Sequence, residues 1–435
     1  MKSIKNILTI FTLSICVLVN AQQTPAPIQK EIVTIHGATA HIGNGSIIEN
    51  SIITFENGKL VAVADAKTSK IALRGNIIDA TGKHVYPGFI APNTTLGLVE
   101  IDAVRQTRDQ DEIGDMIPNV RSLIAYNAES KVTESLRPNG VLLAQITPRG
   151  GTISGTSSIV QLDAWNWEDA AVKVDDGIML HWPSTYKRGR WWLGEPRGYH
   201  PNEKYTDKVN EIKDFIANSN AYGKSTPAKT NEAFKAMQGL FSGEQKIYVY
   251  ANGEKEIIDA VSILKEKGIE HIVIVGGYDA YKVSDFLKSN KISVLIQRVH
   301  TMPNNDDEDY DLTYKLANLL VNDGVLVALQ SSGQMEGMNT RNLPFYAGQL
   351  VGQGMDKEMA LQLITNNPAK ILGLDNQYGT LEVGKSATLF ISEGDALDMR
   401  TNILTRAFID GRDISLESHQ TELWIRYSDK YSEEE

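Results

Sequence analysis

Residues 246–332 alternate between short apolar runs and longer amphipathic runs, and this alternation restricts the fold more than any other feature of the sequence. The apolar runs at 246–251, 271–275 and 292–299 have the length and the β-branched content of strands. Residues 254–267, between the first two runs, repeat apolar side chains at the spacing of one helix face. Strands that are apolar on both faces and alternate with helices form a buried parallel sheet. The sequence therefore predicts an α/β fold.

The α/β pattern extends over residues 86–375, which is enough chain for a closed barrel. We predict a (β/α)8 TIM-like barrel. A doubly wound open sheet is the alternative. No glycine-rich phosphate-binding motif opens a helix in this region, which weakens the dinucleotide-binding version of that alternative.

Both ends of the chain carry a different, β-rich pattern. Residues 22–85 alternate polar and apolar side chains around an Asn-Gly turn at 57–58, and residues 376–435 return to short strands with an Asp-Gly turn at 410–411. We expect the two ends to pair into one small composite β-sandwich. The predicted domains are a signal peptide at 1–21, a first sandwich segment at 22–85, the barrel at 86–375, and a second sandwich segment with a C-terminal tail at 376–435.

The first residues predict export. Lys2 and Lys5 precede an apolar run at 7–19, and the small residue Ala21 follows it. This is the pattern of a secretory signal peptide cleaved after Ala21, which predicts a periplasmic or extracellular protein with no membrane span after signal removal. A lipoprotein signal that uses Cys16 is the alternative. Because Cys16 is the only cysteine, a disulfide framework and a cysteine-ligated metal are excluded.

Composition narrows the class of protein further. The chain has 435 residues, of which 42% are hydrophobic and 22% charged, as in an ordinary globular protein. Its formal net charge of -11 argues against general affinity for nucleic acids or anionic membranes.

Five motifs carry a family resemblance. They lie at 55–63, 78–83, 85–90 (Val-Tyr-Pro-Gly-Phe-Ile), 367–373 and 379–385 (Gly-Thr-Leu-Glu-Val-Gly-Lys). Together and in this order they resemble the amidohydrolase superfamily, especially its imidazolonepropionase-like branch. The resemblance implies a metal centre at the C-terminal mouth of the barrel and hydrolysis of carbon–nitrogen bonds in amides or cyclic amides.

The resemblance also implies metal ligands that this chain lacks. In the family, the Pro-Gly-Phe-Ile motif continues into an Asp and then His-x-His on the first barrel strand. Here the Asp position holds Ala91, and the two His positions hold Asn93 and Thr95. The flanking residues fix this register.

The other ligand positions are also substituted. The catalytic Asp of the last barrel strand falls on Ser332, and the bridging lysine of some relatives falls near Gln161. Strand ends where relatives carry His or Glu-His-Gly hold Tyr250, Asn252 and Gly276. Mis-registration of these middle strands is the alternative. Because neutral side chains replace imidazoles and carboxylates, we expect no metal, no cofactor and no catalytic residue of the usual kind.

Other residues are candidate ligand contacts. Residues 163–205 are rich in aromatic and basic side chains and include Trp165, Trp167 and His181. This segment fits a loop that stacks on a sugar, peptide or aromatic ligand, an insert that caps the barrel, or a partner interface.

Two further candidates follow barrel strands. Arg149 lies in a glycine-rich segment at 147–156, which fits an anion pocket or a plain turn. His300 ends a predicted strand and is a candidate ligand contact rather than a metal ligand.

Three functions remain open. The first is a catalytically degenerate binding or regulatory protein, a pseudoenzyme, whose partner is an active amidohydrolase relative or a second copy of itself. The second is a hydrolase of carbon–nitrogen (non-peptide) bonds that works through a non-standard site. The third is an exported binder of a small molecule, sugar or peptide. Fold alone does not decide among them.

Overall fold

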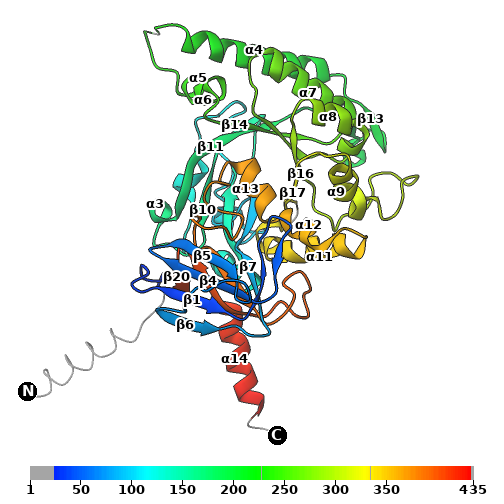
Figure 1. Ribbon diagram of the computed structural model, residues 1–435. Helices are drawn as coiled ribbons and strands as arrows, with labels where there is room; N and C mark the ends of the chain where they lie inside the picture. The colour runs from blue at the N-terminus through cyan, green and yellow to red at the C-terminus, as the bar shows by residue number, and fades with distance from the viewer. Residues whose placement is uncertain (1–23, 227, 334, 433–435) are drawn as a thin grey trace, which may run out of the picture.

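The computed structural model describes residues 24–226, 228–333 and 335–432. The expected signal peptide at 1–21 lies outside these residues. The chain forms a barrel and, below it in the view of Figure 1, a β-sandwich from which the C-terminal helix α14 (His419–Ser432) projects. Within the described ranges, no helix combines the length and the apolar character needed to cross a bilayer.

Eight strands form the wall of the barrel, in the order β17-β16-β15-β14-β11-β10-β9-β8. They are β8 (Phe89–Thr94), β9 (Val141–Ile146), β10 (Ile153–Gln161), β11 (Ala171–His181), β14 (Lys246–Ala251), β15 (Ile272–Gly276), β16 (Ser293–Ile296) and β17 (Val327–Leu329). The last strand lies against the first, so the wall is nearly closed. The predicted α/β, TIM-like architecture is confirmed.

One strand departs from the expected regular barrel. β10 runs antiparallel to both of its neighbours, whereas the other neighbouring pairs are parallel. The reason is the six-residue loop 147–152, which is too short for the crossover that a parallel pair needs. Gly150 and Gly151 in this loop have φ of 84° and 63°, so the chain reverses there. The end of β10 therefore lies at the opposite end of the barrel from the mouth.

The barrel interior is closed by apolar packing at its N-terminal end. Inward side chains such as Ile90, Leu143 and Met179 are fully buried and pack with Ile371 and Leu372 of α13 (Asn366–Leu372). Helices cover the outer wall, and four of them are α4 (Tyr205–Gly223), α7 (Glu254–Glu266), α9 (Leu312–Asn322) and α11 (Leu343–Gly352). This end is therefore plugged, and the C-terminal mouth is the end at which barrels of this type carry functional side chains.

The sandwich is composite, as expected from the two β-rich ends. One sheet has the order β5-β4-β1-β6 and the other the order β20-β19-β18-β7-β2-β3. Their strands are β1 (Val33–His36), β2 (Thr39–His41), β3 (Ile47–Ile48), β4 (Ser51–Glu56), β5 (Lys59–Asp65), β6 (Asn76–Asp79), β7 (His84–Pro87), β18 (Leu389–Ser392), β19 (Leu404–Ile409) and β20 (Arg412–Ile414). The antiparallel pair β7–β18 joins the two ends of the chain.

A buried carboxylate ties the sandwich to the barrel. Asp163, just after β10, accepts hydrogen bonds from Arg137 at 2.9 Å, from Arg412 of β20 at 2.8 Å and from the backbone N–H of Ala26 at 2.9 Å. The Asp163 and Arg137 side chains are only 2% and 3% exposed. A buried charge of this kind is stable only when its partners are all in place.

Replacing this carboxylate therefore tests the junction. We expect Asp163→Ala to lower the free energy of unfolding by about 3–5 kcal/mol, because two guanidinium groups lose their shared acceptor. Urea denaturation measures this. Glu211→Ala, which removes the exposed Lys208–Glu211 pair, is the matched control and should cost less than about 1 kcal/mol. Equal effects of the two substitutions would contradict the assignment.

Candidate functional site

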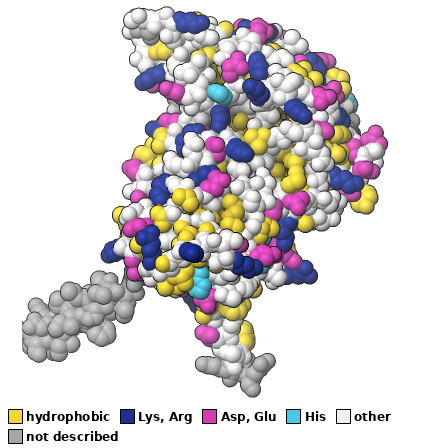
Figure 2. All heavy atoms as spheres, viewed as in Figure 1, with side chains coloured by type: hydrophobic (Ala, Val, Ile, Leu, Met, Phe, Trp, Pro, Cys, Tyr) yellow, Lys and Arg dark blue, Asp and Glu magenta, His cyan; other side chains and the backbone are white. Residues whose placement is uncertain are grey.

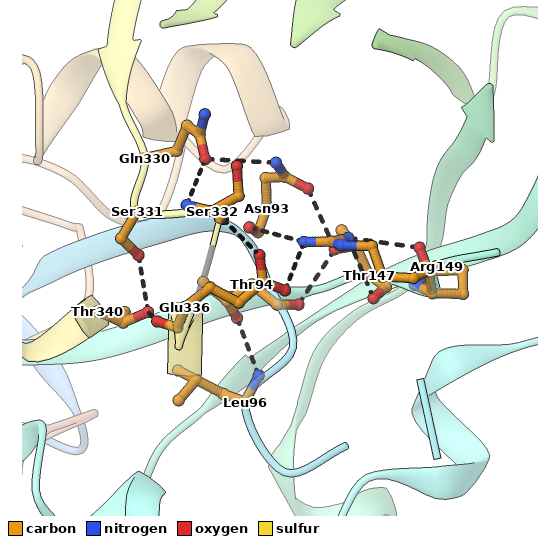
Figure 3. A network of polar contacts seen from close by, with 12 residues as sticks. Asn93, Thr94, Leu96, Thr147, Arg149, Gln330, Ser331, Ser332, Glu336 and Thr340 are labelled. Atoms are coloured by element: carbon orange, nitrogen blue, oxygen red, sulfur yellow. Dashed lines mark hydrogen bonds and ion pairs between the residues drawn. The ribbon is translucent and has the colours of Figure 1, made fainter. Parts of the chain in front are cut away.

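A network of polar side chains occupies the mouth of the barrel. It is formed where β8, β9, β14 and β17 end, together with the short helix α10 (Glu336–Asn339) that follows β17. Figure 3 shows Asn93, Thr147, Arg149, Gln330 and Glu336 turned toward one another at this point.

Asn93 is the centre of the network. It is fully buried and has a φ of 54°, a left-handed conformation that Asn tolerates better than most residues. Its Oδ1 accepts hydrogen bonds from the Tyr250 hydroxyl at 2.5 Å and the Thr147 hydroxyl at 3.2 Å, and its Nδ2 donates to Gln330 at 3.4 Å. The backbone N–H of Asn93 donates to Gln145 at 3.0 Å. Because Oδ1 already accepts two hydrogen bonds, both of its lone pairs are in use.

A guanidinium group lies beside Asn93. Arg149 donates to the Thr147 hydroxyl, to the backbone oxygen of Asn93 at 3.3 Å and to Glu336 Oε1 at 2.9 Å. Its guanidinium carbon is 5.6 Å from the centre of the Tyr250 ring. The second carboxylate oxygen of Glu336 accepts the Gly333 N–H at 3.1 Å. The mouth thus contains a permanent positive charge that is paired and largely buried.

His181 completes this side of the mouth. Its ring stacks on Tyr250 with centroids 4.2 Å apart, and its Nε2 is buried with no hydrogen-bond partner among the described residues. Burial, and then the nearby charge of Arg149, lower the pKa of His181 to about 4, so the imidazole is neutral at pH 7. Burial also raises the pKa of Tyr250 to about 12, so its hydroxyl stays protonated.

These residues do not fit a divalent metal. Across residues 24–226, 228–333 and 335–432, no three His, Cys, Asp or Glu side chains are grouped as a metal site. The Asn93 amide oxygen is already used, and the Glu336 carboxylate is paired with Arg149. A second cation would also be repelled by the guanidinium. The donor set is one of hydrogen-bonding amides and hydroxyls rather than of imidazoles and carboxylates.

The structure brings together several of the residues proposed from sequence. Asn93, Arg149 and Tyr250 contact one another, and His181 stacks on Tyr250. Ser332 adjoins them through its N–H, which donates to Gln330 at 2.7 Å.

Other predicted positions lie beside the network but outside it. Thr95 is buried in the turn after β8. Asn252 lines an outer cavity, and Gly276 lies against its side chain at the end of β15.

Four predicted positions lie outside the network. Gln161 ends β10 and accepts a hydrogen bond from Arg412 at the sandwich, because β10 runs antiparallel. Trp165 and Trp167 follow Gln161 at that same end, where Trp165 is exposed and Trp167 packs on the core. His300 is exposed and packs against Tyr314 and Tyr346. The structure therefore does not bring these four residues into the network at the mouth.

Three members of the network were not predicted from the sequence. Thr147 and Gln330 directly follow barrel strands, a position that in barrels of this type carries functional side chains. Glu336 begins the short helix α10 after β17 and is 7% exposed. A carboxylate in the segment that follows the last barrel strand was the sequence feature that could have indicated it.

Comparisons with known proteins agree with this architecture. The model of the amidohydrolase family matches residues 313–413. The imidazolonepropionase of Thermoplasma volcanium is 23% identical over 383 residues, which cover 84% of this chain and 90% of the relative. The chain is therefore similar to the amidohydrolase family over residues 313–413 and, at low identity, to an imidazolonepropionase over most of its length.

Two solved structures illustrate the shared fold. An amidohydrolase from Thermotoga maritima has a TM-score of 0.77 and 24% identity, and the match covers 88% of this chain and 99% of that one. An adenosine deaminase from Xanthomonas campestris with bound zinc has a TM-score of 0.53 and 13% identity, over 94% and 99% of the two chains. At these identities, the structures support the fold rather than an activity.

The neutral state of His181 predicts a pH dependence of stability. In the unfolded chain, His181 binds a proton near its ordinary pKa of 6.5, whereas in the folded chain it does so only near 4. Its contribution is therefore complete above about pH 6.5 and is lost as the pH falls toward 4, by about 3 kcal/mol in all. Urea unfolding between pH 7.5 and 4 should show a smaller loss for His181→Gln than for the parent. Identical pH profiles for the two proteins would contradict the assignment.

Proposed function

We propose that this protein is a catalytically degenerate member of the amidohydrolase superfamily that works by binding rather than by metal-dependent hydrolysis. The observation that carries the proposal is the buried Arg149 guanidinium, which pairs with Glu336 at the mouth of the barrel. Metal-dependent hydrolysis needs a cation whose open coordination position holds water. A guanidinium has no such position, since it only donates hydrogen bonds.

The metal content of the purified protein tests this proposal directly. We expect elemental analysis after dialysis against zinc to give well below one Zn²⁺ per chain. The matched control is the Xanthomonas campestris adenosine deaminase, whose structure contains zinc, treated in parallel. About one tightly held Zn²⁺ per chain in this protein would overturn the proposal.

The proposed role includes a partner and a location. The partner is an active amidohydrolase relative or a second copy of the chain, and the ligand at the mouth is a small molecule, a sugar or a peptide. Export to the periplasm or beyond is supported by the leader at 1–21. Purification from the exported fraction, followed by size-exclusion chromatography at several salt concentrations, should yield a complex. A protein that elutes alone at every salt concentration would contradict the partner role.

A hydrolase with a non-standard site is the second candidate, and His181 is the observation that favours it. A neutral imidazole whose Nε2 has no hydrogen-bond partner among the described residues has a nitrogen free to accept a proton from water, although its pKa of about 4 makes it a weak base. Release of ammonia or amine from amide and cyclic amide substrates, abolished by His181→Gln with the fold intact, would replace the binding proposal by this one.

A further inference from the structure

A two-stranded hairpin presents bare apolar side chains to solvent. It consists of β12 (Tyr186–Arg188), the short helix η4 (Trp191–Leu193) and β13 (Tyr199–Pro201). Trp191, Trp192 and Leu193, consecutive at its tip, are 59%, 65% and 63% exposed. Tyr186 and Tyr199 on its strands are also exposed. Exposed apolar side chains are common singly, whereas a contiguous group of this kind marks an interaction site.

The same hairpin is locally basic in an acidic protein. It carries Lys187, Arg188, Arg190 and Arg197 against the single acid Glu195, although the whole chain has a net charge of -11. Arg190 pairs with Glu195 at 2.7 Å, which neutralises both. The remaining three basic groups have no carboxylate partner among the described residues. Arg197 lies over the Trp191 ring, 5.2 Å from its centre.

Backbone hydrogen bonds hold the hairpin in a defined conformation. The Gly189 N–H donates to the Gly198 oxygen at 2.9 Å, and a side chain at Gly189 would collide with the Pro196 oxygen. At its base, the Thr185 N–H donates at 2.7 Å to Glu256, a buried carboxylate at the start of α7. Ordered backbone therefore presents the Trp-Trp-Leu tip.

We propose that this hairpin is an interfacial anchor that places Trp191, Trp192 and Leu193 in the headgroup region of an anionic lipid bilayer. Tryptophan and tyrosine favour the boundary between headgroups and acyl chains. Each basic side chain near an anionic leaflet adds attraction. The acidic bulk of the protein does not prevent this, because charges beyond roughly 8–10 Å are screened at physiological salt. Figure 2 shows acidic and basic side chains interspersed over the face in view, so no large single-sign field lies there.

The hairpin fits a bilayer better than a protein partner. A stable protein interface buries about 800 Å² on each side, which requires a broad surface, whereas the apolar group here is the tip of a narrow ribbon. Two copies that met tip to tip would also bring their uncompensated basic groups together, which is unfavourable.

Vesicle sedimentation tests the proposal. The protein beginning at Gln22 is used, since this is the expected mature N-terminus and the apolar leader would itself bind lipid. We expect it to sediment with vesicles of phosphatidylglycerol and phosphatidylcholine but not with phosphatidylcholine alone. The double substitution W191A/W192A should weaken binding about tenfold, because two aromatic side chains no longer enter the interface. Lys187→Gln with Arg188→Gln should weaken binding by a similar factor.

Trp165→Ala is the matched control, since Trp165 is 62% exposed but lies at the other end of the barrel, and it should leave binding unchanged. Circular dichroism verifies that each variant is folded. Three results would overturn the proposal: no sedimentation with anionic vesicles, equal binding to both vesicle types, or equal binding by W191A/W192A and the parent. Loss of a dimer in W191A/W192A without vesicle binding would assign the hairpin to contacts between copies.

Discussion

The Arg149 guanidinium carries its positive charge inside the barrel mouth, and the neighbouring groups are arranged to satisfy it. A charge removed from water is stable only if donors and acceptors replace its hydration. Here, the replacements come from three strand ends and one loop: the backbone of Asn93, the Thr147 hydroxyl, the Tyr250 ring and the Glu336 carboxylate. One side chain thus connects segments that are up to 187 positions apart in sequence.

This arrangement also explains the states of the groups around it. Burial and the positive charge keep a proton off His181, and burial keeps the Tyr250 hydroxyl protonated. Asn93, the centre of the network, then accepts from two hydroxyls and donates to Gln330. Every polar group named here except His181 Nε2 has a hydrogen-bond partner among the residues that the structure describes. A ligand that entered the mouth would therefore have to exchange hydrogen bonds with this network or use that one nitrogen.

The sequence predicted the fold well because its signals are local. Apolar strands and amphipathic helices identified the barrel, and the alternating ends identified the composite sandwich. The family resemblance singled out Asn93 and Tyr250 as substituted ligand positions, and in the structure these two side chains share a hydrogen bond. Gln161, Trp165 and Trp167 lie at the opposite end of the barrel, because the direction of β10 is decided by the length of a loop rather than by the strand's own residues. The Arg149–Glu336 ion pair could not be predicted from the sequence for a different reason, since no local pattern links two residues that are 187 positions apart.

The two ends of the barrel depend on different interactions. The apolar plug of α13 and the Asp163 junction close the N-terminal end. Asp163 pairs with two arginines outside the Arg149 network, and substitutions at distant sites without shared partners have nearly independent effects on stability. Substitutions of Asn93, Arg149 or Glu336 can therefore alter the chemistry of the mouth without disrupting the packing at the N-terminal end of the barrel. The motifs that resemble the amidohydrolase superfamily lie largely in the sandwich and beside that closed end. They therefore indicate the fold, whereas an activity would depend on the residues at the mouth.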